Sequence, residues 1–360
     1  MRKLRHRLSL LLRMPDARVP GKVSDRLIRV GGAAALVPLL AQHGIDPGAL
    51  VAEAGLSLGV FASPDNVVPF EALCRVVALA ADRTHLPDIG LRACTQTGLR
   101  ALGTVGYLVA HSETVERGLA ALQEYLYVHD QAATPFFTRE GAMAFLGYEI
   151  LGPDVPGADQ VTFGALAIAA NILRELCGAG FRLQEVTVAY RAPTQTSLFR
   201  SFFHAPVRFG ADRSALAFEA RWLVARIPSA DPYLREVLTE RIQGELALAG
   251  DTALDRIRRV VRSLVAGGKF GVDDAAAAFL VDRRTLARRL ARHGTSFRAV
   301  RDDARHASAR RLLGASDLPI AAIAERLGYA DATTFCRAFR RWSGASPRKW
   351  RSASAGFHAR

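Results

Sequence analysis

Arginines near the carboxyl end of the chain recur at a spacing that suits the reading of DNA. Arg284 and Arg288 lie four positions apart, and Arg337 follows Arg288 at an offset of 49 residues. Residues four apart share one face of a helix, and a guanidinium group can bond both O6 and N7 of guanine in the major groove. These residues therefore predict a helix face that reads bases. The alternative is a solvated arginine face on an ordinary helical bundle.

The residues around these arginines occur twice in similar order. The segment TLARRLARHGTSF (285–297) matches TFCRAFRRWSGASP (334–347), and Asp282 can cap the first helix. Each copy carries two large apolar side chains four positions apart, which pack inward from one helix face; they are Leu286, Leu290, Phe335 and Phe339. Such a repeat indicates a helix-turn-helix unit used twice. The repetition favours DNA reading over the solvated-face alternative.

The second copy also resembles a known family. LPIAAIAERLGYADATTFCRAFRRWSGASPRKWR (318–351) is similar to the terminal signature of the AraC/XylS family of bacterial transcription regulators, and the resemblance covers about residues 252–352. The positions in register are Ile323, Ala324, Leu327, Gly328, Tyr329, Phe335, Arg337, Phe339, Gly344, Pro347 and Arg351. The resemblance implies an all-α domain with two helix-turn-helix motifs, joined by a long helix at 298–316.

Carried over by position, the resemblance implies a set of DNA contacts. The residues expected to face bases are Arg284, Ala287, Arg288, Ala332, Thr333, Cys336 and Arg337. Beside what the resemblance implies, we expect phosphates to be held and the register to be set by Arg283, Arg289, Arg340 and Lys349, together with the amides after Asp282. Two positions depart from the family pattern: Leu280 stands where glycine is usual in the first turn, and Asp282 replaces serine. Aspartate caps a helix as well as serine does.

Charge divides the chain as a DNA-binding protein with a second domain would require. Residues 251–360 hold 23 Lys/Arg against 10 Asp/Glu, whereas 23–250 hold 18 against 23, and 1–22 hold 7 against 1. We expect a basic tail at 1–22, an effector-binding or dimerisation domain at 23–249, the DNA-binding domain at 250–353 and a short tail at 354–360. Charge alone would also permit a protein that binds a membrane surface.

The N-terminal domain is predicted to be α+β, with helices over a small antiparallel sheet. Apolar periodicity predicts helices at about 26–42, 69–83, 87–97, 102–111, 114–128, 157–178, 197–204, 231–248 and 252–266. Alternating residues predict a hairpin of 133–140 and 142–150 around Gly141, and short strands at 185–190, near 207 and at 215–219. About residues 24–245 resemble the ligand-binding-type domain of the family branch typified by regulators of ornithine utilisation, on the segments 98–128 and 202–223.

The candidates for an effector pocket are few. Tyr125, His129 and Gln160 could form part of its wall, since ligand pockets are mostly apolar with a few polar groups. An aromatic cluster could line the same pocket, but the core of the domain is the favoured interpretation; its members are Tyr125, Tyr127, Phe136, Phe137, Phe145 and Tyr148.

Catalysis and metal binding find little support in the sequence. GLSLG (55–59) matches a nucleophile elbow but lacks the strand and helix that an elbow needs. Four scattered cysteines and single histidines show no metal-ligand spacing. We therefore expect no enzyme activity, catalytic residue, metal or cofactor. No apolar run is long enough to span a membrane.

These observations predict a cytoplasmic, nucleoid-associated transcription regulator, controlled by a small-molecule effector at its N-terminal domain. Its expected partners are double-stranded promoter DNA, an effector, a second copy of the chain and RNA polymerase, with no membrane. Two alternatives stay open: a constitutive DNA-binding protein whose N-terminal domain only dimerises, and an enzyme with an appended DNA-binding module.

Overall fold

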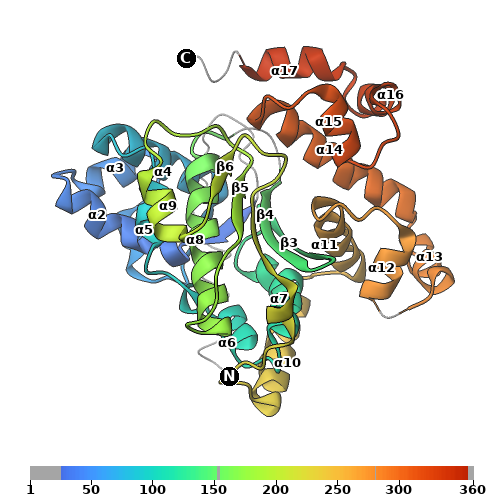
Figure 1. The fold of residues 1–360 in the computed structure, drawn as a ribbon, viewed down its shortest axis with the longest axis horizontal. Helices are drawn as coiled ribbons and strands as arrows, with labels where there is room; N and C mark the ends of the chain where they lie inside the picture. The colour runs from blue at the N-terminus through green and yellow to red at the C-terminus, as the bar shows by residue number, and fades with distance from the viewer. Residues whose placement is uncertain (1–25, 152–154, 280, 356–360) are drawn as a thin grey trace.

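The computed structural model describes residues 26–151, 155–279 and 281–355 (Figure 1). An N-terminal α+β part is joined to a C-terminal helical part, which confirms the predicted fold class. The basic tail expected at 1–22, the turn position Leu280 and residues 356–360 lie outside the described residues. Within the described ranges, no helix has both the length and the apolar character that a membrane span requires.

A five-stranded sheet forms the centre of the N-terminal part. Its strands lie in the order β3 (Ala133–Glu140), β4 (Met143–Ile150), β7 (Ala215–Glu219), β5 (Glu185–Val188) and β6 (Val207–Phe209). The predicted hairpin is confirmed: β3 and β4 pair antiparallel around Gly141, whose φ of +61° suits glycine. The β5–β6 pair is parallel, because α9 (Ser197–Phe203) crosses between these two strands.

The predicted helix at 26–42 is wrong in its first half. Residues Leu27–Arg29 form strand β1, which pairs with β2 (Val67–Pro69), and a 3-10 helix (Gly31–Ala35) then leads into α2 (Leu36–Gln42). The Arg29 amide donates to the His129 carbonyl over 2.8 Å. Long-range backbone pairing therefore overrides the local helical periodicity at this end of the chain.

Helices cover the sheet and complete the N-terminal core. They are α3 (Pro47–Glu53), α4 (Phe70–Thr84), α5 (Ile89–Cys94), α6 (Thr104–Ala110), α7 (Val115–Tyr125), α8 (Ala158–Cys177) and α10 (Pro232–Leu248), with 3-10 turns at Leu58–Ala62, Leu99–Leu102, Leu126–Val128 and Ala220–Val224. The long helix α8 buries Phe163, Leu166 and Leu173 against the sheet residues Leu146 and Leu216. Burial of this apolar surface is the main force that holds the two layers together.

The C-terminal part contains two small cores on one long helix. Its elements are α11 (Ala253–Ala266), α12 (Val272–Ala278), α13 (Arg283–Ala291), α14 (Phe297–Ala315), α15 (Ile320–Arg326), α16 (Ala332–Ser343) and α17 (Pro347–Ala355). The first core joins α11, α12 and α13 to the start of α14, and the second joins its later part to α15 and α16. Helix α14 is thus the linking helix expected at 298–316.

The two parts of the chain meet at the sheet. Helix α11 lies beside β3, where the Ser263 hydroxyl donates to the Pro135 carbonyl over 2.7 Å (Figure 1). Helix α14 contacts the end of β4, where Arg311 Nη2 lies 3.1 Å from Glu149 Oε2 and Ser308 donates to the same carboxylate. These side chains are buried, so the DNA-binding part is docked on the sheet rather than tethered beside it.

Candidate DNA-binding surface and effector pocket

The two predicted recognition helices present matching exposed faces. Helices α13 and α16 lie on the side of the C-terminal part that faces away from the sheet (Figure 1). Leu286 and Leu290 are fully buried beneath α13, and Phe335 and Phe339 are fully buried beneath α16. Five of the base-reading candidates are exposed on the outside, namely Arg284, Ala287, Arg288, Thr333 and Arg337. The other two, Ala332 and Cys336, are half-buried and pack partly against the second core.

Both recognition helices begin with the same cap. The Asp282 carboxylate accepts from the Thr285 amide over 2.6 Å, and Asp331 accepts from the Thr334 amide over 2.7 Å. Each aspartate thereby satisfies an amide that the first helical turn leaves without a partner. These bonds lower the pKa of both carboxyl groups below its ordinary value. Asp282 therefore serves as a cap at the position where the family pattern has serine.

The phosphate candidates occupy less uniform positions. Arg340 and Lys349 are exposed at the end of α16 and at the start of α17. Arg283 is also exposed, but its guanidinium group forms an ion pair with Asp273 of α12. Arg289 lines a groove between α13 and the N-terminal part, together with Glu124 of α7. The structure thus gives Arg283 and Arg289 protein neighbours that the sequence pattern did not indicate.

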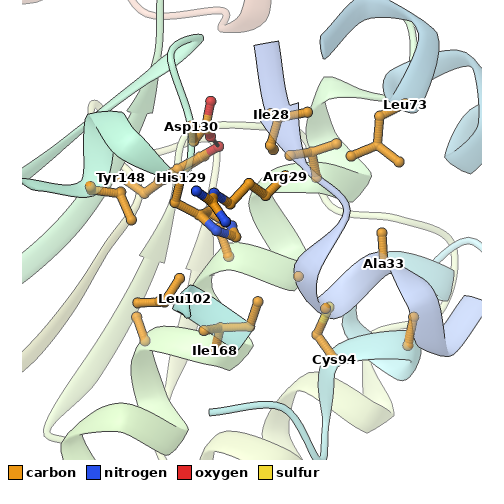
Figure 2. A pocket seen from close by; sticks show the side chains of 18 of the residues that line it. Ile28, Arg29, Ala33, Leu73, Cys94, Leu102, His129, Asp130, Tyr148 and Ile168 are labelled. Atoms are coloured by element: carbon orange, nitrogen blue, oxygen red, sulfur yellow. Dashed lines mark hydrogen bonds between the residues drawn. The ribbon is translucent and has the colours of Figure 1, made fainter. Parts of the chain in front are cut away.

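A narrow cavity of about 120 Å³ lies inside the N-terminal part (Figure 2). Strand β1, the 3-10 helix that follows it, α5, α8 and the β3–β4 hairpin form its walls. Most of the wall is aliphatic, and its larger side chains are Ile28, Val30, Leu36, Leu73, Val77, Leu102, Leu122, Leu126, Leu146, Ile168 and Ile172. A concave, mainly apolar space with a few polar groups is the usual form of a small-molecule site.

The polar side chains of Arg29, His129 and Asp130 lie together at one end of the cavity, where Arg29 and His129 are side by side (Figure 2). Arg29 donates to the Asp65 carboxylate over 2.9 Å and to the Val128 carbonyl over 3.3 Å. The Tyr148 hydroxyl donates to the buried Asp130 carboxylate over 2.5 Å. Asp65 therefore balances the charge of Arg29, and the Asp130 carboxyl is held by a hydrogen bond from a neutral group.

His129 has no such balance. Its side chain is 9% exposed, and Nδ1 has no hydrogen-bond partner among the described residues. The imidazole is held closely, because a Cβ atom on Gly31 would lie 2.8 Å from His129 Cε1, and Gly31 has a φ of +45°. A buried polar atom without a partner is costly. Because Nδ1 is also shielded from the cavity, a ligand there could reach only the other ring nitrogen, Nε2, which has no hydrogen bond to a described residue either.

The three residues expected in an effector pocket differ in position. His129 and Gln160 line the cavity, whereas Tyr125 lies outside it, against α10, and its hydroxyl accepts from Gln243 over 3.3 Å. Gln160 joins α8 to α5 through bonds to the Gly90 amide and the Pro87 carbonyl. The sequence analysis missed Arg29 and Asp130 altogether. Arg29 is a single polar residue between apolar neighbours, and Asp130 stands between two other polar residues, His129 and Gln131. Neither pattern distinguishes a cavity from a surface.

The buried pair His129 and Asp130 gives opposite pH dependences. Burial, with the nearby Arg29 charge, lowers the pKa of His129 to about 4. Burial raises the pKa of Asp130 to about 6, against the hydrogen bond from Tyr148. As pH falls from 7 to 5, the unfolded chain protonates its histidine more readily than the folded chain, which destabilises the fold. The folded chain protonates Asp130 more readily than the unfolded chain, which stabilises it.

We therefore expect two substitutions to separate these effects. When the pH falls from 7 to 5, the free energy of unfolding of His129→Phe should decrease by about 2 kcal/mol less than that of the unsubstituted protein. The reason is that the variant has no histidine at this position to be protonated in the unfolded chain. Over the same pH range, the free energy of unfolding of Asp130→Asn should decrease by about 1 kcal/mol more than that of the unsubstituted protein, because the stabilising protonation of Asp130 is gone. Urea unfolding at several pH values measures both. Parallel stability curves for all three proteins would contradict the assignment.

Comparison with known proteins agrees with this architecture. Residues 44–227 match the family model of the arabinose-binding domain of AraC transcription regulators, and residues 275–353 match a helix-turn-helix domain model. The chain is 27% identical over 328 residues to the HTH-type transcriptional regulator VirS of Mycobacterium tuberculosis, covering 91% of this chain and 96% of that one. It is 26% identical to the ornithine utilization regulator of Pseudomonas aeruginosa, covering 93% and 99%.

One solved structure aligns with most of this chain. The crystal structure of the transcriptional regulator CdpR from Pseudomonas aeruginosa is 23% identical, covers 88% of this chain and 96% of that chain, and has a TM-score of 0.44. The family model of the N-terminal domain alone matches more than half of the present chain. The chain therefore belongs to the AraC family of transcription regulators, with an effector-binding-type N-terminal domain and a helix-turn-helix DNA-binding domain.

Proposed function

We propose that a small molecule in the N-terminal cavity controls how the two recognition helices meet promoter DNA. The observation that carries this proposal is the position of the β3–β4 hairpin. Successive strand residues point to opposite faces of a sheet. Pro135, Leu146 and Tyr148 line the cavity, while their neighbours Phe136 and Glu149 contact α11 and α14 on the other face. A ligand that shifts the hairpin therefore acts on both sides.

Control of this kind requires a ligand that binds two docking states of the protein with different affinities. The docked state is the one described above. In an undocked state, α11 and α14 leave the sheet and the two recognition helices are presented differently. We propose that the regulator acts on DNA without enzymatic activity. Equal DNA affinity with and without every cavity ligand would instead support a constitutive DNA-binding protein.

The DNA-reading proposal is tested at Arg288 and Arg337. Genome-wide footprinting of the full chain first identifies the preferred site. Arg288→Ala or Arg337→Ala should then cost about 1–3 kcal/mol of binding free energy on that site and relax discrimination at one base position. Fluorescence anisotropy against single-base variants of the site measures this. Arg221→Ala, which removes an exposed arginine of the N-terminal part, is the matched control and should leave binding unchanged.

Lys349 provides the contrasting case. If Lys349 contacts a phosphate, Lys349→Ala should lower the DNA affinity equally on all sequences. The slope of log affinity against log salt concentration should fall by about 1 in magnitude. An equal loss on every sequence for Arg288→Ala would contradict its base-reading role. An unchanged salt slope for Lys349→Ala would remove that residue from the interface.

We also propose that the regulator binds DNA as a homodimer, since paired half-sites increase specificity. Helices α6 and α10 pack together on the side of the N-terminal part that lies away from the recognition helices (Figure 1). They expose large apolar side chains, with Tyr107 at 54%, Tyr233 at 77% and Val237 at 42% exposure. Tyr233→Ser with Val237→Ser should shift the protein to a monomer in sedimentation velocity. An unsubstituted protein that sediments as one chain would contradict this.

A further inference from the structure

We infer that the cavity takes a compact, uncharged and mainly apolar molecule, about the size of a benzene ring, that carries one hydroxyl group. The inference rests on the proposal that this cavity is the effector site, and it adds the chemical class of the effector. It follows from the size of the cavity, its aliphatic walls, the unpartnered nitrogen of His129 and the existing partners of Arg29 and Asp130.

The volume limits the ligand first. The cavity measures about 120 Å³. An engineered apolar cavity of about 150 Å³ in another protein binds benzene. The present space therefore accommodates a single small ring or a short branched chain, and a fused ring system or long acyl chain would have to displace the walls. Because packed interiors resist such displacement, a compact ligand is favoured.

The walls then decide the character of the ligand body. Leu102 and Ile168 lie below the polar side chains in the view of Figure 2, and Cys94 and Ala33 lie to their right. None of these side chains offers a strong hydrogen-bonding group. A pentose carries a hydroxyl group on nearly every carbon, and each one left unpaired in such a space would cost about 1–3 kcal/mol. An apolar ring gains free energy from the same walls.

The polar end of the cavity indicates which polar group the ligand carries. The His129 ring lies in the wall of the cavity beside Arg29 (Figure 2), and its Nε2 has no hydrogen bond to a described residue, whereas its Nδ1 is shielded from the cavity. The donor or acceptor role of Nε2 depends on the tautomer of the ring. A hydroxyl group fits either tautomer, because it can donate or accept. One hydroxyl group on the ligand would therefore satisfy the atom that the protein leaves unsatisfied.

The charges at this end favour an uncharged ligand. Arg29 already pairs with Asp65, and its Nε donates to a backbone carbonyl. Asp130 is buried and holds the Tyr148 hydroxyl. A carboxylate brought into the cavity would lie near the Asp130 carboxyl and would lose its hydration without gaining an unshared cation. An amino acid would require the protein to release both of its existing pairs.

The test uses the full chain and five probes. Phenol, toluene, benzoate, arabinose and ornithine are titrated by isothermal calorimetry, and DNA affinity is measured with and without each. Arabinose appears in the name of the matched family model, and ornithine in the name of one relative. We expect phenol to bind about tenfold more tightly than toluene, which corresponds to one hydrogen bond. Benzoate, arabinose and ornithine should bind more weakly than either.

Three variants locate the binding. His129→Phe keeps a ring but removes the nitrogen, so the tenfold preference for phenol over toluene should disappear. Ala169→Leu fills part of the cavity and should weaken phenol and toluene alike. His43→Phe, at an exposed histidine outside the cavity, should change neither. If His129→Phe does not fold, Ala169→Leu and the probe series on the unsubstituted protein still decide the question.

The outcomes test two proposals separately: the chemical class of the ligand, and control of DNA binding by a ligand in the cavity. Toluene binding as tightly as phenol, a tighter complex with benzoate, or no binding by any probe would overturn the inference. Arabinose or ornithine that binds more tightly and changes DNA affinity would also overturn it, while supporting effector control. Phenol that binds as expected but leaves DNA affinity unchanged would support the ligand class and contradict the proposed function.

Discussion

Replacement of Glu149 with alanine should undock the DNA-binding part from the sheet. The Glu149 and Arg311 side chains are 4% and 7% exposed, and Ser308 donates to the same carboxylate. Removal of the carboxylate leaves the guanidinium charge of Arg311 buried without its partner, which costs about 3–5 kcal/mol. We expect this loss to appear as a free C-terminal part in limited proteolysis and in small-angle scattering. DNA affinity should also stop responding to ligands of the cavity.

A second ion pair between the two parts provides the matched control. Arg191 and Asp317 also join them, with Nη2 and Oδ1 2.6 Å apart, but their side chains are 78% and 72% exposed. Exposed pairs contribute about 0–1 kcal/mol, so Asp317→Ala should leave docking intact. The double variant Glu149→Leu with Arg311→Met should restore docking, because no charge is left buried. If Glu149→Ala docks as firmly as Asp317→Ala, the buried pair does not hold the parts together.

Replacement of Phe335 with alanine should unfold the second DNA-reading motif. Phe335 is fully buried, and its ring centroid lies 5.6 Å from that of Tyr329 and 5.9 Å from that of Phe339. Truncation of a buried phenylalanine costs about 3–5 kcal/mol, and a core as small as this one has few other contacts to offset the loss. We expect DNA binding to weaken on every sequence while the N-terminal part retains its thermal transition.

The neighbouring residue Cys336 separates this packing effect from base reading. Its side chain is half-buried at the edge of the second core and is much smaller than a phenylalanine ring, so Cys336→Ala should cost the motif no more than about 1 kcal/mol. Circular dichroism and anisotropy on both variants make the comparison. An unaltered thermal transition for the C-terminal part of Phe335→Ala would show that the second core does not depend on this ring.

The sequence indicated the DNA-binding part well because its determinants are local. Leu286 and Leu290 stand one helical turn apart, and the capping aspartate lies within four residues of the first of them, so spacing alone predicts the packing. The double helix-turn-helix fold is confirmed. The individual DNA contacts stay predictions, because exposure does not show which base a side chain meets. The boundary near 249 also stays a prediction.

The cavity and the docking contacts could not be predicted in the same way. Arg29, Asp130 and Tyr148 come from β1, the segment before β3, and β4, and their meeting depends on strand pairing between distant segments. Strand β1 has three residues, which is too short for a periodic signal. Glu149 and Arg311 lie far apart in sequence, and each alone resembles an ordinary surface charge. Only the folded arrangement shows that both are buried.

The contact between α11 and β3 has a consequence for solubility. Strand β3 is an edge of the sheet, and edge strands tend to pair with other chains. Here Pro135 lacks an amide hydrogen, its carbonyl accepts from Ser263 of α11, and the Phe137 amide donates to Gln123 of α7. The Ser263 bond comes from the DNA-binding part. An N-terminal fragment that ends before residue 250 would therefore bare a strand edge and tend to aggregate.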